Sequence, residues 1–297
     1  MLRIEIMYKF FKNYIFSVIF YLFLIFPDLC IQGEEETSAS NNIVAIVAGN
    51  PVTKDQVFDL LMERYPAQAQ EIITELILYQ IVKLEAKQEK ISFSSHFLEK
   101  KASEEIEKIK KDIEKNRKQS WQDYLIQAGV SEEKFFSDTV RKLRYKIALQ
   151  SLIRLSEMKE VQIDARHIML ASKEKAQEIL TKLRSNADFE ALVQKESLSA
   201  TKNQGGMFPK LFQGDIDPSL EKVLFSLKPM KISDVVQSPW GYHILQVIRV
   251  YPSKPDASWT QDRIEILDSL EKNPVSDRSL KRWLEKMGKK YSIMQKF

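Results

Sequence analysis

The chain has 297 residues, of which 44% are hydrophobic and 29% are charged, as in globular proteins with a hydrophobic core. Its 45 basic and 41 acidic residues nearly balance, so the net charge is only +4. This small excess argues against nucleic acid as a partner, because nucleic-acid-binding proteins need a concentrated basic face. The only cysteine is Cys30, which excludes an internal disulfide.

The first 33 residues differ in character from the rest. A basic start precedes an apolar run at residues 15–26, which is short for a membrane span and typical of the central part of a signal peptide. We therefore expect residues 1–33 to be a signal peptide, cleaved after Gly33. The mature protein would then lie in the periplasm and have no transmembrane helix. Two alternatives stay open: an uncleaved anchor, or a lipid attached at Cys30.

Residues 34–42 (EEETSASNN) are polar and predict a flexible leader. Residues 43–48 predict a short strand, ended by the turn sequence at 49–51. Thr53 and Gln56 have the spacing of a helix capping box. Beyond them, apolar residues recur every three or four positions, so we predict a helical domain across 43–157. Its later helices are expected at 71–90, 97–118, 120–128 and 131–158.

Residues 161–252 combine β-like runs, short helical segments and glycine-rich turns, which predicts an α+β domain. Side chains alternate along the last strand, so His243 shares a face with Leu245 and Val247. The second histidine of this region, His167, lies in the first strand. No cysteine or carboxylate cluster accompanies the pair, so we expect no metal site. Strands are predicted at 161–170, 232–236 and 242–250, and helices begin at Ser172, Asp188 and Pro218.

Residues 256–297 follow a proline-containing linker and predict two helices, at 259–270 and from Ser276 to Gly288, and a strand at 291–297. About 40 residues with large aromatic side chains cannot easily bury these alone. We therefore expect them to pack back on the N-terminal domain. The predicted fold class is α+β: a mostly helical domain built from both ends of the chain, with an α+β domain inserted in it.

The central region has a His-Ile strand, a Gly-Gly loop, an F-Q-G-x-x-x-P segment and the sequence W-G-Y-H-I, in that order. This order resembles the parvulin family of peptidyl-prolyl isomerases. Residues 43–57 and the helices after them resemble the N-terminal domain of SurA-type periplasmic chaperones and their PrsA-like relatives. The resemblance implies an exported foldase without a cofactor. Its expected partners are unfolded or proline-containing polypeptides, such as outer-membrane or secreted proteins.

The resemblance also implies the residues of a site. His167 and His243 match the two histidines of the parvulin floor, and Ser238 falls where the family usually has threonine. Ser199 aligns with the cysteine or aspartate of active members. The substrate-binding residues implied in the same way are Leu211, Ile216, Leu220 and Trp240.

The chemistry of X-Pro isomerisation requires no strong nucleophile. The twisted transition state loses amide conjugation and is less polar than the ground state, so a water-poor apolar pocket favours it. Ser199 is a weaker polar partner than a carboxylate, and Pro209 fixes φ in a loop where the family usually has glycine. Two functions therefore stay open. One is an active isomerase and chaperone; the other is a pure holdase with a catalytically degenerate domain, in which both histidines are core residues.

Overall fold

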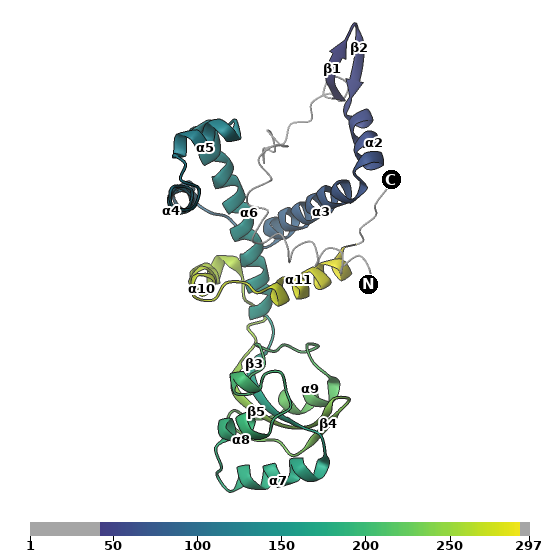
Figure 1. Ribbon diagram of the computed structural model, residues 1–297, viewed down its shortest axis with the longest axis vertical. Coiled ribbons are helices and arrows are strands. Elements are labelled where there is room, and N and C mark those ends of the chain that lie inside the picture. The colour runs from purple at the N-terminus through teal and green to yellow at the C-terminus, as the bar shows by residue number, and fades with distance from the viewer. Residues whose placement is uncertain (1–41, 292–297) are drawn as a thin grey trace. The chain divides into compact units, whose positions relative to one another are not determined.

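The structure is a computed structural model that describes residues 42–291 (Figure 1). The expected signal peptide at 1–33, all but the last residue of the leader at 34–42, and all but the first residue of the strand at 291–297 lie outside this range. The chain divides into two compact units. One combines the N-terminal part up to Ile153 with the C-terminal part from Asp262, and the other is Arg154–Gln261.

The first unit is mostly helical. It begins with an antiparallel hairpin of β1 (Ile43–Val47) and β2 (Asn50–Thr53). We predicted a turn at 49–51 and missed β2, since Pro51 is a poor strand residue that only an edge strand tolerates. Five α-helices and a π-helical turn follow: α2 (Lys54–Arg64), α3 (Pro66–Gln88), α4 (Ser95–Asp112), η3 (Ile113–Arg117), α5 (Trp121–Ala128) and α6 (Glu132–Met158). The C-terminal part adds α10 (Trp259–Lys272) and α11 (Asp277–Lys290).

Local sequence explains several helix ends. The side chain of Thr53 accepts a hydrogen bond from the Gln56 backbone N–H at 3.2 Å, and the Thr53 N–H donates to Gln56 Oε1 at 2.9 Å. This is the predicted capping box. Gly129 ends α5 in the left-handed region at φ 65°. The predicted end of the last helix at Gly288 is wrong, because α11 continues to Lys290 and keeps Met287 in the core.

The C-terminal helix α11 shares one core with the N-terminal helices. Lys290 Nζ lies 2.6 Å from Glu85 Oε1 on α3, and the Tyr291 hydroxyl donates to the same carboxylate. The predicted fold class, a helical domain from both ends of the chain with an α+β insert, is confirmed. No helix among the described residues has both the length and the apolar character needed to cross a bilayer. The shared core contains Leu78, Ile81, Val82, Ala148, Leu149, Leu152, Ile153, Leu280, Trp283, Leu284 and Met287.

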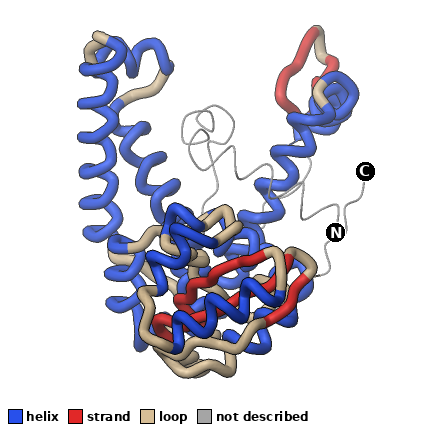
Figure 2. Tube along the Cα trace, turned by 60° about the horizontal axis from the view of Figure 1, so that its bottom comes forward, coloured by secondary structure: helices blue, strands red, loops and turns tan. Residues whose placement is uncertain are grey.

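The second unit is built on a three-stranded antiparallel sheet with the order β3-β5-β4. Figure 2 shows its strands in red. Helices α7 and α8 pack on one face of it, and α9 packs on the other. The strand predicted at 232–236 instead spans 236–238: Ile232 makes only an isolated bridge, and the Leu245 N–H donates to the Ser233 hydroxyl and not to its carbonyl. The elements are β3 (Gln162–Leu170), α7 (Lys173–Arg184), α8 (Phe189–Glu196), η4 (Lys202–Gln204), α9 (Pro218–Leu224), β4 (Val236–Ser238) and β5 (Gly241–Tyr251).

Candidate active site

The two histidines of the second unit meet on one face of the sheet. In the β3–β5 register Met169 faces His243 and His167 faces Leu245, so the histidines are diagonal neighbours two residues apart. Their Nδ1 atoms are 3.1 Å apart, and the rings are nearly parallel at 12°. His167 is 5% exposed and His243 is 2% exposed. The strand alternation thus places both imidazoles in a buried floor.

Hydroxyl groups extend this histidine pair at both ends. His243 Nε2 is 2.7 Å from Ser238 Oγ on β4. His167 Nε2 is 2.8 Å from Ser199 Oγ and 3.2 Å from Thr201 Oγ1, and these two hydroxyls are 3.0 Å apart. All four residues expected to be catalytic therefore lie in one hydrogen-bonded chain. Sequence reasoning missed Thr201, although its position two residues after Ser199 in the same loop was a usable signal.

The direction of hydrogen-bond donation at one end of this network determines the direction at the other end. Both imidazoles are neutral, so only one of the two facing Nδ1 atoms carries a proton. If His167 Nδ1 donates, its Nε2 accepts from Ser199 or Thr201, and His243 Nε2 donates to Ser238. If His243 Nδ1 donates, both outer bonds reverse. The floor is therefore a connected network with two tautomeric arrangements.

Burial keeps the floor uncharged. Removal from water, and to a smaller extent the adjacent His243, lower the pKa of His167 from 6.5 to about 4. Burial also lowers the pKa of His243, an effect that the nearby carboxylate of Asp217 opposes. Both rings are therefore neutral at physiological pH. A neutral floor suits a reaction whose transition state is less polar than its ground state.

A tight loop fastens the end of the network formed by Ser199 and Thr201 to β3. The His167 N–H donates to the Gly206 carbonyl at 2.9 Å. Gly206 has φ 74°, and a Cβ at this position would lie 2.2 Å from the His167 carbonyl oxygen, so only glycine fits. The buried Ser197 hydroxyl accepts the N–H groups of Met169 and Ser199, each at 3.2 Å. This loop therefore sets the position of Ser199 and Thr201.

The residues expected to bind substrate fall into two groups. Ile216 is half-buried, and Trp240 is 65% exposed in the turn between β4 and β5, where its N–H donates to Ser238 Oγ at 3.1 Å. In contrast, Leu211 is 0% exposed and Leu220 is 3% exposed, and both lie in the core beneath α9. The second group lies beneath the surface. It therefore supports the accessible apolar side of the site, which we call the wall, rather than lining it. Sequence reasoning missed Phe208, whose half-buried ring lies 4.2 Å from the His167 ring.

A second polar contact fixes α9, the helix next to the wall. Asp217 caps α9 by accepting the Ser219 N–H at 2.9 Å, and the Ser219 hydroxyl donates to it as well. The Ser219 hydroxyl also lies 2.9 Å from the Gln237 carbonyl on β4. The bonds from Ser219 lower the pKa of Asp217. The helix that carries Leu220, and the adjacent Ile216, are therefore tied to the strand that carries Ser238.

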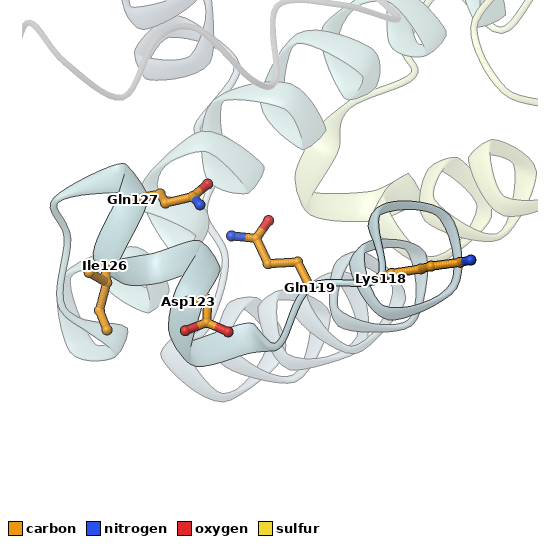
Figure 3. A pocket seen from close by; sticks show the side chains of 5 residues that line it. All are labelled: Lys118, Gln119, Asp123, Ile126 and Gln127. Atoms are coloured by element: carbon orange, nitrogen blue, oxygen red, sulfur yellow. The ribbon is translucent and has the colours of Figure 1, made fainter.

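Two further features lie outside this network. Among the described residues, no group of three or more histidine, cysteine, aspartate or glutamate side chains is arranged to hold a metal ion. An open cavity of about 520 Å³ lies in the helical unit, where Gln119, Asp123 and Gln127 border it together with Lys118 and Ile126 (Figure 3). It shares no residue with the histidine network.

Comparison with known proteins identifies this region. Residues 155–249 match the family "Rotamase: PPIC-type PPIASE domain". Over 252 residues the chain is 26% identical to foldase protein PrsA 2 of Bacillus cereus, which covers 83% of this chain and 79% of the relative. It is 28% identical over 233 residues to foldase protein PrsA 2 of Listeria innocua, covering 75% of this chain and 72% of the relative. The crystal structure of the peptidylprolyl isomerase PrsA from Bacillus anthracis covers 75% of this chain and all of that one, with 25% identity and a TM-score of 0.37.

Proposed function

We propose that this chain, a PrsA-like parvulin chaperone with one PPIase domain, is an extracytoplasmic foldase that isomerises X-Pro bonds. The observation that carries the catalytic part is the neutral, buried floor of His167 and His243 next to an apolar wall that keeps part of its surface accessible. The basic and apolar N-terminal segment supports action outside the cytoplasm. We assign catalysis to residues 161–252, and client binding to residues 43–157 together with 256–297.

The proposed roles follow from exposure. Ile216, Phe208 and Trp240 form the side that a proline ring contacts, because each keeps part of its surface accessible. Ser199 and Thr201 are half-buried at one end of the network, where a hydroxyl offers a hydrogen bond to the peptide as its bond twists. The network stabilises the twisted amide because its hydrogen-bonding groups are already held in place before substrate arrives.

A proline-limited refolding assay tests this proposal. The protein from residue 34 onward, which contains every described residue, is expected to accelerate the slow phase that X-Pro isomerisation imposes. Ser199→Ala should reduce the acceleration several-fold. Ser226→Ala serves as the matched control, because Ser226 lies beyond the end of α9, is exposed, and its hydroxyl donates to the Val223 carbonyl in the last turn of that helix. An uncatalysed refolding rate with the folded parent protein would exclude the isomerase.

A second function, holding of unfolded chains, rests on a separate observation. The hairpin and α2 expose many large apolar side chains. Such a surface suits reversible contact with unfolded polypeptides of varied sequence, and it would serve a holdase even if the histidine site were inactive. Suppression of client aggregation by a protein lacking residues 161–252 would support this role, and its loss in that protein would contradict it. The exposed set is Ile43, Val44, Ile46, Val47, Val57, Phe58, Leu60 and Tyr65.

A further inference from the structure

The net charge of the chain is concentrated in one helix. Helix α11, Asp277–Lys290, contains six basic and two acidic residues. Its net charge is therefore +4, the same as that of the whole protein. The remaining 283 residues carry 39 basic and 39 acidic side chains. Helix α4 is also rich in lysine, but its five basic residues are balanced by five acidic ones. Among the described helices, α11 thus carries the largest net charge.

The charges of α11 are sorted by helical face. Its buried residues, Leu280, Trp283, Leu284 and Met287, form one face toward the helical core. The basic residues recur at intervals of three or four on the opposite face, so they form a continuous stripe. Four of them are half-buried and already have interaction partners, so any external ligand competes with these. We call this set, Arg278, Lys281, Arg282, Lys286 and Lys289, the basic stripe.

The basic stripe is held in a fixed orientation. The apolar face of α11 is part of the core that it shares with α3 and α6, so the helix cannot rotate about its axis without exposing Trp283 and Leu284. At the C-terminal end, Lys290 and Tyr291 both contact Glu85 of α3. These contacts also remove Lys290 from the stripe. The stripe is therefore presented by a rigid helix, and not by a flexible tail.

We propose that the basic stripe docks on a bilayer surface that contains anionic phosphate headgroups. A flat array of negative charge can contact all five side chains at once, and each Lys or Arg near such a surface strengthens binding about fivefold. The apolar segment at residues 15–26 supports this partner, because it directs the chain to a membrane. Docking by α11 requires no isomerase activity.

Vesicle co-sedimentation tests the proposal with the protein from residue 34 onward. Vesicles of phosphatidylglycerol and phosphatidylcholine are compared with pure phosphatidylcholine at low and high salt. The triple variant Lys281→Gln, Arg282→Gln, Lys286→Gln should bind the anionic vesicles at least about fivefold more weakly than the parent, since partners within the protein reduce each side chain's contribution. The control variant Lys100→Gln, Lys108→Gln, Lys111→Gln removes three exposed charges from α4. It should bind within about twofold of the parent, although its net charge equals that of the α11 variant.

Binding to anionic vesicles that salt weakens and that only the α11 variant loses would support the stripe. Equal losses in both variants would mean a response to net charge alone and would overturn it. Absence of binding to anionic vesicles would overturn it too, as would vesicle binding that is unchanged in the α11 variant. If polyglutamate binds the parent while vesicles do not, the stripe serves acidic polypeptides instead. The refolding assay on the same variants separates these outcomes from any failure of the isomerase.

Discussion

The α+β unit buries polar side chains, whereas the N-terminal hairpin exposes apolar ones. In the α+β unit the floor buries two imidazoles, and every nitrogen of both rings has a hydrogen-bonding neighbour. In the hairpin all five residues of β1 are exposed, and Val47 is 65% exposed. The first arrangement fixes geometry around one peptide bond. The second offers apolar area without a fixed shape, which suits clients that differ in sequence.

This contrast predicts how substitutions divide between stability and function. In the α+β unit the site is part of the core, so changes to its frame lower the free energy of unfolding. In the hairpin the apolar side chains already face solvent, so changes there leave folding nearly unaffected and alter client binding. The predictions that follow run from the largest expected effect on stability to the smallest.

Gly206→Ala should have the largest effect. The new Cβ would meet the His167 carbonyl oxygen at 2.2 Å in a backbone conformation that alanine rarely adopts, so we expect a loss of about 3–5 kcal/mol. Gly214→Ala is the matched control: φ is also positive there, at 87°, but no atom lies within 4 Å of the added Cβ. It should cost only about 1–2 kcal/mol of strain. Hydrogen exchange of β3 and β5 amides measures both, and equal protection in the two variants would contradict the steric argument.

Leu220→Ala and Ile216→Ala should separate the core from the wall. Leu220 is 3% exposed, so its truncation should lower the free energy of unfolding by about 2–5 kcal/mol. Ile216 is half-buried and should lose less, about 1 kcal/mol, since less of its side chain leaves water on folding. We expect the reverse order for catalysis per folded molecule, with Ile216→Ala slower. Urea unfolding and the refolding assay give the two quantities, and a larger catalytic loss in folded Leu220→Ala would show that the wall is misassigned.

Acidification should destabilise the α+β unit through His167. The pKa of His167 is about 4 in the folded protein against 6.5 for the free side chain, so between these values only the unfolded chain binds the proton. Stability from this residue is therefore complete above pH 6.5 and declines as the pH falls toward 4, by at most about 3 kcal/mol. Unfolding free energies across this pH range measure the slope.

The variant His167→Gln isolates this contribution, because glutamine does not titrate. Its unfolding free energy should depend less steeply on pH between 6.5 and 4 than that of the parent. His96→Gln is the control, since His96 is exposed on α4 and solvent surrounds it in both states. An unchanged slope in His167→Gln would mean that the imidazole is not held neutral by burial.

Sequence patterns predicted the parts of the fold that depend on local chemistry. The capping box at Thr53, the helix stop at Gly129 and the alternation that buries His243 all follow from neighbouring residues. Errors arose where a distant contact decided the outcome. Gly288 stays helical because the same turn carries Met287 into the core, and Ser233 replaces a regular ladder bond with its side chain.

The candidate site shows the same division. Alternation along β5 gave the face of His243, and the family resemblance supplied Ser199 and Ser238. Nothing in the sequence distinguished Leu220, which is buried, from Ile216, which keeps accessible surface, since both are apolar and lie four residues apart. Their difference depends on how α9 packs against the sheet, a contact between distant segments. Phe208 was missed for a similar reason, since its contact with the distant ring of His167 places it in the site.

Ile46→Lys should change stability least and client binding most. Ile46 is 65% exposed on β1, so lysine there removes no core contact, and the free energy of unfolding should shift by less than about 0.5 kcal/mol. A charge in the middle of the exposed apolar set should nevertheless weaken suppression of client aggregation, because the client must desolvate it. Ile126→Lys is the control, with an isoleucine that is 77% exposed on α5, away from the hairpin in sequence. If both variants suppress aggregation equally, the hairpin has no special role, and the contrast with the α+β unit would reflect exposure alone.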